Sequence, residues 1–530
     1  MKYFKLLLAC FSVMIVAYAV MAQNMNLNTE KLNMAEYAIK GYYVDSINET
    51  KLVEDAIVGM LDKLDPHSTY SNAEETKELN EPLQGNFGGI GIQFNMKDDT
   101  LYVIQTVAGG PSEKLGIIAG DRIVKVNDTV IAGVNMKNTD IMKRLRGPKG
   151  TKVNVKVKRR GVPELIDFRI TRDDIPLYSV DASYMVDDKT GYIRISRFAS
   201  DTHKEFINAI KKLKDSGMQQ LIIDLSDNGG GYLQAAVEMA NEFLNKGENI
   251  VFTEGRNSPR YDANALGTGS LKKEKIVVIV NQYSASASEI FAGAIQDWDR
   301  GIIVGRRTFG KGLVQRPFPF RDGSMMRLTV ARYYTPSGRS IQKPYDEGDK
   351  KAYEKDILNR FNNGEFMNAD SIHFSDSLKY VTLKNKRKIY GGGGIMPDVF
   401  VPLDTTEYTN YYRDVVAKGV LNQFVIDYVD KNRTELTGKY RDVEAFDKDF
   451  VVDNSLLEDL KVQAEKEKIK FDEEQYNKSK DLISLIIKAL IARDLYDTEA
   501  YFRIINHRNK MLNKALEIIN NDKEYKKLIM

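Results

Sequence analysis

Two segments of the chain contain the residue types needed for a serine hydrolase active site. Residues 284–289 read Ser-Ala-Ser-Ala-Ser-Glu, and Lys311 stands between two glycines further along the chain. Histidine, the usual base for a serine nucleophile, occurs only four times in 530 residues, and none of the four lies in a recognisable catalytic motif. A serine activated by a lysine therefore fits this composition better than a Ser-His-Asp triad.

Ser286 is predicted to lie where a buried strand, residues 276–280, passes into a helix that begins near Ala287. The first N–H groups of a helix have no partner within it, and the helix dipole favours negative charge there. A nucleophile at this junction would have an anion-stabilising site beside it. The alternative is that the serines only cap the helix, with Glu289 completing a capping box.

Lys311 is the candidate base. A solvated lysine has a pKa of about 10.4 and is a poor base at neutral pH, whereas burial disfavours the ammonium and lowers the pKa. Gln315 follows four residues later. If this segment is a strand, the even spacing places both side chains on one face, where the amide could orient the amine. Without the serine motif, Lys311 could equally be a surface lysine in a turn.

A third segment, residues 224–231, reads Asp-Leu-Ser-Asp-Asn-Gly-Gly-Gly and lies between a predicted buried strand and a predicted helix. Glycines allow unusual dihedral angles and close backbone approach, which suits an oxyanion hole made of main-chain N–H groups. The segment lacks the lysine and hydroxyl residue of a phosphate-binding P-loop. The alternative is a tight turn between strand and helix.

The N-terminal residues predict an export signal. Residues 1–22 combine Lys2 and Lys5 with an apolar run and a small-residue cleavage site before Gln23. We therefore expect an exported, periplasmic protein, with an uncleaved membrane anchor as the alternative. The single cysteine, Cys10, lies in this leader, so the remaining chain is expected to have no disulfide and no thiol chemistry.

Four further regions differ in their periodicity. Residues 23–84 and 405–530 show helical spacing of apolar residues, whereas residues 85–172 alternate as short strands between glycine-rich turns. Residues 173–404 alternate strands with helices, and their continuous apolar runs are typical of strands buried on both faces. A charged insert at 344–388 interrupts this region. The sequence thus predicts a multidomain α+β protein with an α/β core and helical regions at both ends.

Composition argues against one class of partner. The chain has 77 basic and 74 acidic residues, so its net charge is close to zero. A nucleic-acid-binding protein usually shows a strongly basic domain or stripe. We therefore expect no nucleic-acid partner.

The order of these motifs resembles that of the C-terminal processing peptidases, also called tail-specific proteases. The resemblance runs from about Tyr43 to Pro402 and implies a crotonase-like ββα peptidase core with an inserted PDZ domain. It also implies that Ser286 is the nucleophile, Lys311 its base and Gln315 the third member of the catalytic set. The segments that carry the resemblance are residues 64–68, 85–172, 284–289, 309–312, 330–339 and 394–398.

The same resemblance implies an oxyanion hole. It assigns the N–H of Ala287 together with that of a glycine, for which Gly230 is the first choice and Gly231 the second. The family usually has arginine and often proline at the positions where this chain has Ser226 and Gly229. These departures put the local loop geometry in question more than the chemistry.

The PDZ-like region implies how a substrate is held. PDZ folds bind an extended peptide along a sheet edge and hold its terminal carboxylate in a backbone nest. By resemblance the carboxylate loop is Gly89, Ile90, Gly91 and Ile92, and its apolar side chains predict a preference for apolar C-termini. The alternative is a PDZ domain that regulates or gates the active site.

The expected function is therefore an exported serine endopeptidase that cleaves proteins near their C-termini and needs no metal or organic cofactor. Expected partners are protein or peptide substrates with apolar C-termini and an adaptor protein. The helical termini could join further copies of the chain, but a partner helix within the same chain explains their apolar stripes equally well. The alternative is a PDZ-containing envelope chaperone or pseudoprotease that only binds peptides. An unrelated α/β hydrolase is disfavoured because Gly-x-Ser-x-Gly is missing around Ser286.

Overall fold

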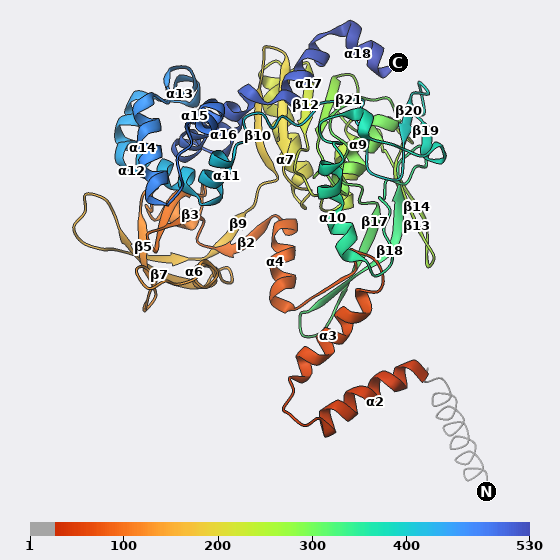
Figure 1. Cartoon of the computed structure of the whole chain (residues 1–530), viewed down its shortest axis with the longest axis horizontal. Coiled ribbons are helices and arrows are strands. Elements are labelled where there is room, and N and C mark those ends of the chain that lie inside the picture. The colour runs from red at the N-terminus through yellow and green to blue at the C-terminus, as the bar shows by residue number, and fades with distance from the viewer. Residues whose placement is uncertain (1–26) are drawn as a thin grey trace.

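The computed structural model describes residues 27–530 (Figure 1). The predicted signal peptide, residues 1–22, lies outside the described residues. Within the described part, no helix is both long and apolar enough to cross a membrane.

A six-stranded sheet forms the centre of the molecule, with strand order β10-β11-β12-β15-β16-β21. Strand β10 is antiparallel to β11, and every other neighbouring pair is parallel. This arrangement agrees with the predicted α/β core, because parallel strands need crossover connections. The strands are β10 (Val180–Met185), β11 (Thr190–Ile195), β12 (Gln220–Asp224), β15 (Lys275–Val280), β16 (Ile302–Gly305) and β21 (Val399–Phe400).

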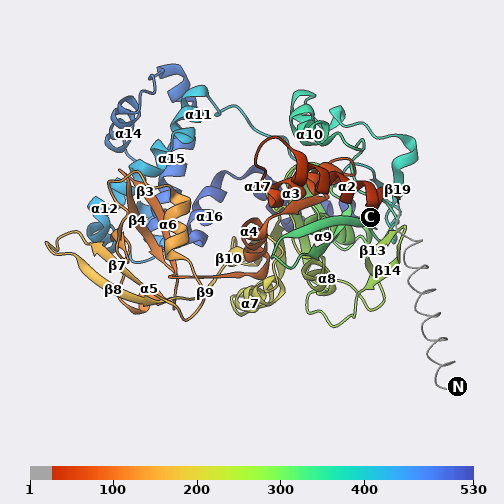
Figure 2. The same ribbon diagram turned by 90° about the horizontal axis from the view of Figure 1, so that it is seen from below.

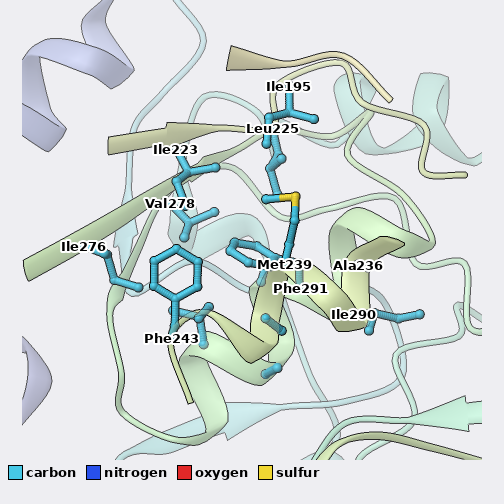
Figure 3. Packing of buried hydrophobic residues seen from close by; sticks show 14 of the residues in the cluster. Ile195, Ile223, Leu225, Ala236, Met239, Phe243, Ile276, Val278, Ile290 and Phe291 are labelled. Atoms are coloured by element: carbon cyan, nitrogen blue, oxygen red, sulfur yellow. The ribbon is translucent and has the colours of Figure 1, made fainter. Parts of the chain in front are cut away.

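Helices cover both faces of this sheet. On one face, Ile223 and Val278 pack against Met239, Phe243 and Phe291 of the adjoining segments (Figure 3). Strand residues in between, such as Ile222, point to the opposite face, because successive strand side chains alternate. The first face carries α7 (Thr202–Asp215), α8 (Leu233–Asn241) and α9 (Ala287–Asp297); the second carries α17 (Lys510–Asn520) and α18 (Asp522–Ile529).

A second sheet brings the N-terminal part of the chain to the core. Its order is β1-β18-β13-β14, and β17 pairs with β18. Strand β1 (Thr69–Ser71) therefore lies beside β18 (Met325–Tyr334), although more than 250 residues separate them in sequence. The other strands are β13 (Asn249–Gly255), β14 (Ser258–Asn264) and β17 (Leu313–Pro319); helices α2 (Leu27–Tyr42) and α3 (Glu49–Leu61) precede β1, and α4 (Ala73–Gln84) follows it.

The PDZ-like region forms a separate sheet with order β3-β4-β5-β7-β8, and β6 pairs with β5. Strands β2 (Asn86–Gly89) and β9 (Asp173–Pro176) pair at its junction with the core. Its elements are β3 (Ile92–Lys97), β4 (Thr100–Thr106), α5 (Pro111–Lys114), β5 (Arg122–Val126), β6 (Thr129–Val130), α6 (Asn138–Leu145), β7 (Lys152–Lys158) and β8 (Ile166–Thr171).

The helices after residue 405 divide into two groups. The first six share a hydrophobic core of their own and lie beside the PDZ-like region (Figures 1 and 2). The last two, α17 and α18, belong to the central sheet instead, a division that the helical pattern of the sequence does not show. The first group comprises α11 (Asn410–Ala417), α12 (Val420–Lys439), α13 (Val443–Asp449), α14 (Asn454–Lys466), α15 (Glu473–Leu495) and α16 (Thr498–Ile505).

The charged insert is folded. It contains α10 (Lys350–Asn362) and a two-stranded ribbon of β19 (Lys379–Val381) and β20 (Lys388–Tyr390). Arg360 of α10 is 3% exposed and donates to the carbonyl oxygens of Thr308 and Arg307, at 3.0 and 2.7 Å. The insert therefore supports the loop that leads to Lys311.

Candidate active site

The three segments singled out in the sequence follow three adjacent parallel strands. Residues 225–231 follow β12, residues 281–286 follow β15, and residues 306–312 follow β16. The carboxyl ends of parallel strands meet at one edge of the sheet, which is where α/β proteins place their sites. The fold therefore brings the serine, lysine and glycine segments together.

Ser286 is the N-cap of α9 and has an unusual backbone conformation, with φ 56° and ψ −113°. Positive φ is strained for a residue other than glycine and costs on the order of 1–3 kcal/mol. The side chain is half-buried, unlike those of its serine neighbours. This turn from strand to helix places a strained, accessible serine at the edge of the sheet.

Ser284 and Ser288 have structural roles. Both are fully buried. The Ser284 hydroxyl donates to the carbonyl oxygen of Leu225 at 2.7 Å, and the Ser288 hydroxyl donates to that of Asn228 at 2.9 Å. The two side chains therefore fasten the serine loop to the glycine-rich loop, while Ser286 stays partly exposed.

Glu289 connects the serine and lysine loops. One carboxylate oxygen accepts from the N–H groups of both Ser286 and Lys311, at 2.9 and 2.8 Å. The other accepts from the Gly310 N–H at 2.7 Å and the Thr308 hydroxyl at 2.5 Å. Glu289 is completely buried, and this burial raises its pKa to about 7, although the four hydrogen bonds favour its ionised form. The capping residue thus also sets the spacing between Ser286 and Lys311.

Tyr333 makes a second connection between the same loops. Its hydroxyl lies 3.1 Å from the carbonyl oxygen of Ser286 and also contacts that of Lys311. The ring is 2% exposed, within the core of the domain. The N–H groups of Ser286 and Lys311 thus donate to Glu289, and their carbonyl oxygens accept from Tyr333.

The amine of Lys311 is in an environment that favours its neutral form. Burial lowers its pKa, and the positive charge of Arg327 lowers it further, while Glu289 and Asp65 act in the opposite direction. Among the described residues, the structure records no hydrogen bond from Lys311 Nζ to Ser286 or Gln315. Catalytic hydrogen bonds are often long in unliganded enzymes and shorten when substrate binds.

Gln315 differs from the prediction in its local geometry. Strand β17 begins at Leu313, so Lys311 precedes it, and a register shift lies between Val314 and Gln315. The condition of that prediction, a single regular strand from Lys311 to Gln315, is therefore not met. The Gln315 amide instead donates from Nε2 to the hydroxyl of Thr329 on β18, at 3.2 Å.

Of the three glycines in the loop, only Gly230 has an N–H with a recorded partner among the described residues. The Gly230 N–H donates to Asn228 Oδ1 at 2.9 Å, so it is not free in this conformation. The N–H groups of Gly231 and Ala287 have no recorded partner among the described residues. Gly230 packs against the serine loop, where an added Cβ would lie 2.8 Å from the Cβ of Ser286. In this structure Gly231 and Ala287 are thus available as donors, as is the exposed Gly229.

Two residues that were not among the predicted site residues lie at the site. His67 Nε2 is 2.9 Å from the hydroxyl of Tyr353 on α10. Burial, and then the charge of Lys311, lower the pKa of His67 to about 3, so its ring is neutral at physiological pH. The 64–68 motif was the sequence signal for His67. The position of His67 beside Lys311, however, depends on the pairing of β1 with β18.

The PDZ-like region has the features expected of a carboxylate site. The carbonyl oxygens of Ile90 and Gly91 accept from Ser112 and Val107 N–H groups, at 3.1 and 3.0 Å. The N–H groups of Ile90 and Gly91 have no recorded partner among the described residues. Strand β3, which follows them from Ile92, lies at the edge of its sheet. An extended peptide could therefore pair with this edge and place its carboxylate on these N–H groups.

Comparisons with known families match separate parts of the chain. Residues 189–350 match peptidase family S41, and residues 88–170 match the PDZ domain. Residues 15–76 match the N-terminal domain of the activating protease CtpB. Residues 411–497 match a family of unknown function.

Individual relatives cover much of the chain. A carboxy-terminal-processing protease from Bartonella bacilliformis is 39% identical over 339 residues, which are 61% of this chain and 76% of the relative. Carboxy-terminal processing protease CtpA from Bacillus subtilis is 39% identical over 315 residues, 59% of this chain and 66% of the relative. Among solved structures, photosystem II D1 C-terminal processing protease is 32% identical, with a TM-score of 0.34 and coverage of 59% of this chain and 83% of that protein.

Proposed function

The chain belongs to the carboxy-terminal processing proteases of peptidase family S41, and we propose that Ser286 and Lys311 are the nucleophile and general base of this serine-type peptidase. The observation that supports this assignment best is the pair of hydrogen bonds from both residues to one oxygen of Glu289. A buried carboxylate that fixes the two loops against each other gives the preorganised geometry that catalysis requires. The peptide-binding alternative does not require such a connection.

In the proposed reaction, neutral Lys311 removes the proton from the Ser286 hydroxyl, and the serine oxygen attacks the scissile carbonyl carbon. The N–H groups of Ala287 and Gly231 stabilise the oxyanion, each contributing roughly 3 kcal/mol. Lys311, now an ammonium, protonates the leaving amine. Water then attacks the acyl-enzyme by the reverse route and releases Ser286.

We further propose that the PDZ domain binds the C-terminal tail of the substrate, and that contacts with the C-terminal helices hold the PDZ domain in one position while it does so. Ile426 of α12 is 3% exposed and packs with Tyr102 and Ile104 of β4. Asp430, one turn later, pairs with Arg122 and Arg160 at 3.1 and 3.3 Å. Ile426 packs with the PDZ residues and not with the core of the helical region. These contacts support a role for the C-terminal helices in holding the PDZ domain.

Weakening the contact between α12 and the PDZ domain is expected to impair cleavage of a tail-bearing protein more than cleavage of a short peptide. In Asp430→Ala and Ile426→Ala, KM for a reporter protein with an apolar tail should rise about fivefold, because a mobile PDZ domain lowers the effective concentration of the bound tail. Cleavage of a short peptide should stay within about twofold of wild type. Glu435→Ala, an exposed change on the same helix, is the matched control.

The reporter assay also tests tail recognition itself. A reporter whose tail ends in two aspartates should be cleaved more slowly by wild type than one that ends in an apolar residue. Equal cleavage of both tails, with no effect of Asp430→Ala, would exclude the proposed role of the PDZ domain while leaving the peptidase assignment intact.

Export is proposed from the leader sequence alone. Cleavage before Gln23 would remove the residues with the apolar run. An intact-mass measurement of the protein purified from the cell envelope tests this proposal. A mass that includes residues 1–22 would favour the anchored alternative.

A further inference from the structure

Asp65 lies on the segment between α3 and β1, next to the active site. Its Oδ1 accepts from the N–H groups of His67 and Ser68, at 2.9 and 3.1 Å, and from the hydroxyl of Thr329, at 2.8 Å. Its Oδ2 accepts from the Ser68 hydroxyl at 2.5 Å. The carboxylate is therefore held in one orientation, and one of its hydrogen bonds reaches β18.

Thr329 lies between Asp65 and Gln315, and the chemistry of its hydroxyl fixes the direction of both hydrogen bonds. A hydroxyl has one hydrogen to donate, and an ionised carboxylate can only accept. Thr329 therefore donates to Asp65, and its lone pair accepts from Gln315 Nε2 at 3.2 Å. The two ends of an amide are similar in shape but opposite in hydrogen-bonding role, so this connection decides which end of Gln315 faces which neighbour.

Strand β18 contributes more than the hydroxyl to this connection. The N–H of Thr329 donates to the Ser68 hydroxyl at 3.1 Å, and Thr69 pairs with Arg327 in the strand register. Ser68 is 1% exposed. Residues 65–69 are thus hydrogen-bonded to β18 near Thr329. The same strand pairs with β17, where Gln315 lies opposite Thr329.

We infer that Asp65 and Thr329 are positioning residues that orient the Gln315 amide, with its NH2 toward Thr329 and its carbonyl oxygen free to accept from Lys311. This inference rests on the proposed roles of Ser286 and Lys311. A neutral amine has two N–H groups and one lone pair. When Gln315 Oε1 accepts one N–H, the rotation of the amine is restricted and its lone pair can be directed at the Ser286 hydroxyl. A reversed amide would present donors to Lys311 instead.

The charge of Asp65 has a second effect on the same lysine. It favours the ammonium form of Lys311, in opposition to burial and to Arg327. The ammonium is the form that exists after Lys311 has taken the serine proton. Asp65 thereby stabilises the proton-transfer product without touching the reacting atoms.

Thr329→Val and Thr329→Ser test the inference. Valine has nearly the shape of threonine and a high strand propensity, but it cannot make either hydrogen bond. We expect kcat to fall roughly 10- to 100-fold in Thr329→Val with little change in KM, because the catalytic groups lose their alignment. Thr329→Ser keeps the hydroxyl and should stay within about threefold of wild type. Thermal unfolding of each variant confirms that it is folded.

A double-mutant cycle with Gln315→Ala separates positioning from a general structural role. If Thr329 acts through Gln315, the double variant should be no slower than Gln315→Ala alone, whereas independent effects would multiply. Multiplied effects, or wild-type kcat in Thr329→Val, would overturn the inference. Wild-type kcat in Gln315→Ala would overturn it as well. Wild-type activity in Ser286→Ala would instead contradict the proposed function, so the two failures are distinguishable.

Discussion

Ser286→Ala and Lys311→Ala are each expected to lower kcat for cleavage of a tail-bearing reporter protein by at least about 10⁴-fold, because nucleophile and base act as one unit. Lys311→Arg should be equally inactive, since a guanidinium does not lose its proton at usable pH. The double variant should be no slower than either single variant. Cleavage is measured by gel or mass spectrometry over matched times, with thermal unfolding as the control for folding.

The pattern across these variants distinguishes the alternatives. An inactive wild type that still binds tail peptides would favour the chaperone or pseudoprotease function. Activity of the wild type that persists in Ser286→Ala would place the nucleophile elsewhere. Activity that is lost in Ser286→Ala but retained in Lys311→Arg would mean that another group is the base.

Gly230→Ala is expected to abolish activity, whereas Gly229→Ala next to it should be tolerated. Gly230 has φ 100°, and an added Cβ would lie 2.7 Å from the carbonyl oxygen of Ala285 and 2.8 Å from the Cβ of Ser286. Alanine there is strained and pushes directly on the nucleophile loop. At Gly229 an added Cβ meets nothing within 4 Å. We expect at least about a 100-fold loss of kcat for Gly230→Ala, since displacements near 1 Å can cost that much.

Gly229→Ala serves as the matched control because it adds the same methyl group one residue away. It should retain activity within about twofold, with an unchanged melting temperature. Similar activity in both variants would show that the close contact between the glycine loop and Ser286 is not needed for catalysis.

Much of the core could be predicted from local sequence patterns. The apolar runs at 221–225 and 276–280 form β12 and β15, and the helix predicted from Ala287 begins there. Ser286 was distinguished from its two neighbours by resemblance alone; the structure supplies the physical reason, because Ser284 and Ser288 are buried and tied to carbonyl oxygens.

The features that were missed all depend on contacts between distant parts of the chain. His67 was expected to have no catalytic context, yet the pairing of β1 with β18 brings it beside the lysine loop. The insert had no predicted role, yet Arg360 supports that loop. Such pairings leave no local periodicity for a sequence pattern to reveal. The strand assumed to run from Lys311 to Gln315 does not form, because β17 begins at Leu313 and a register shift precedes Gln315.

The choice between Gly230 and Gly231 as oxyanion donor also depended on hydrogen bonds that the sequence does not reveal. Both are glycines with positive φ in the same loop. In the structure Asn228 accepts the Gly230 N–H, which is why Gly231 is the glycine proposed for the oxyanion hole. A motif can indicate that a glycine loop forms an oxyanion hole, but the hydrogen bonds of that loop determine which N–H is free.

The most direct measurement of the proposed chemistry is the rate at which a fluorophosphonate reagent labels Ser286, followed by intact-mass and peptide mass spectrometry across a pH series. In wild type we expect one adduct, on Ser286, whose rate of formation rises with pH with a midpoint below the ordinary lysine pKa, because burial lowers the pKa of Lys311. In Lys311→Ala the rate should be far lower at every pH. Labelling of Lys311→Ala at the wild-type rate, or labelling of wild type at a different residue, would contradict the assignment of Lys311 as the base that activates Ser286.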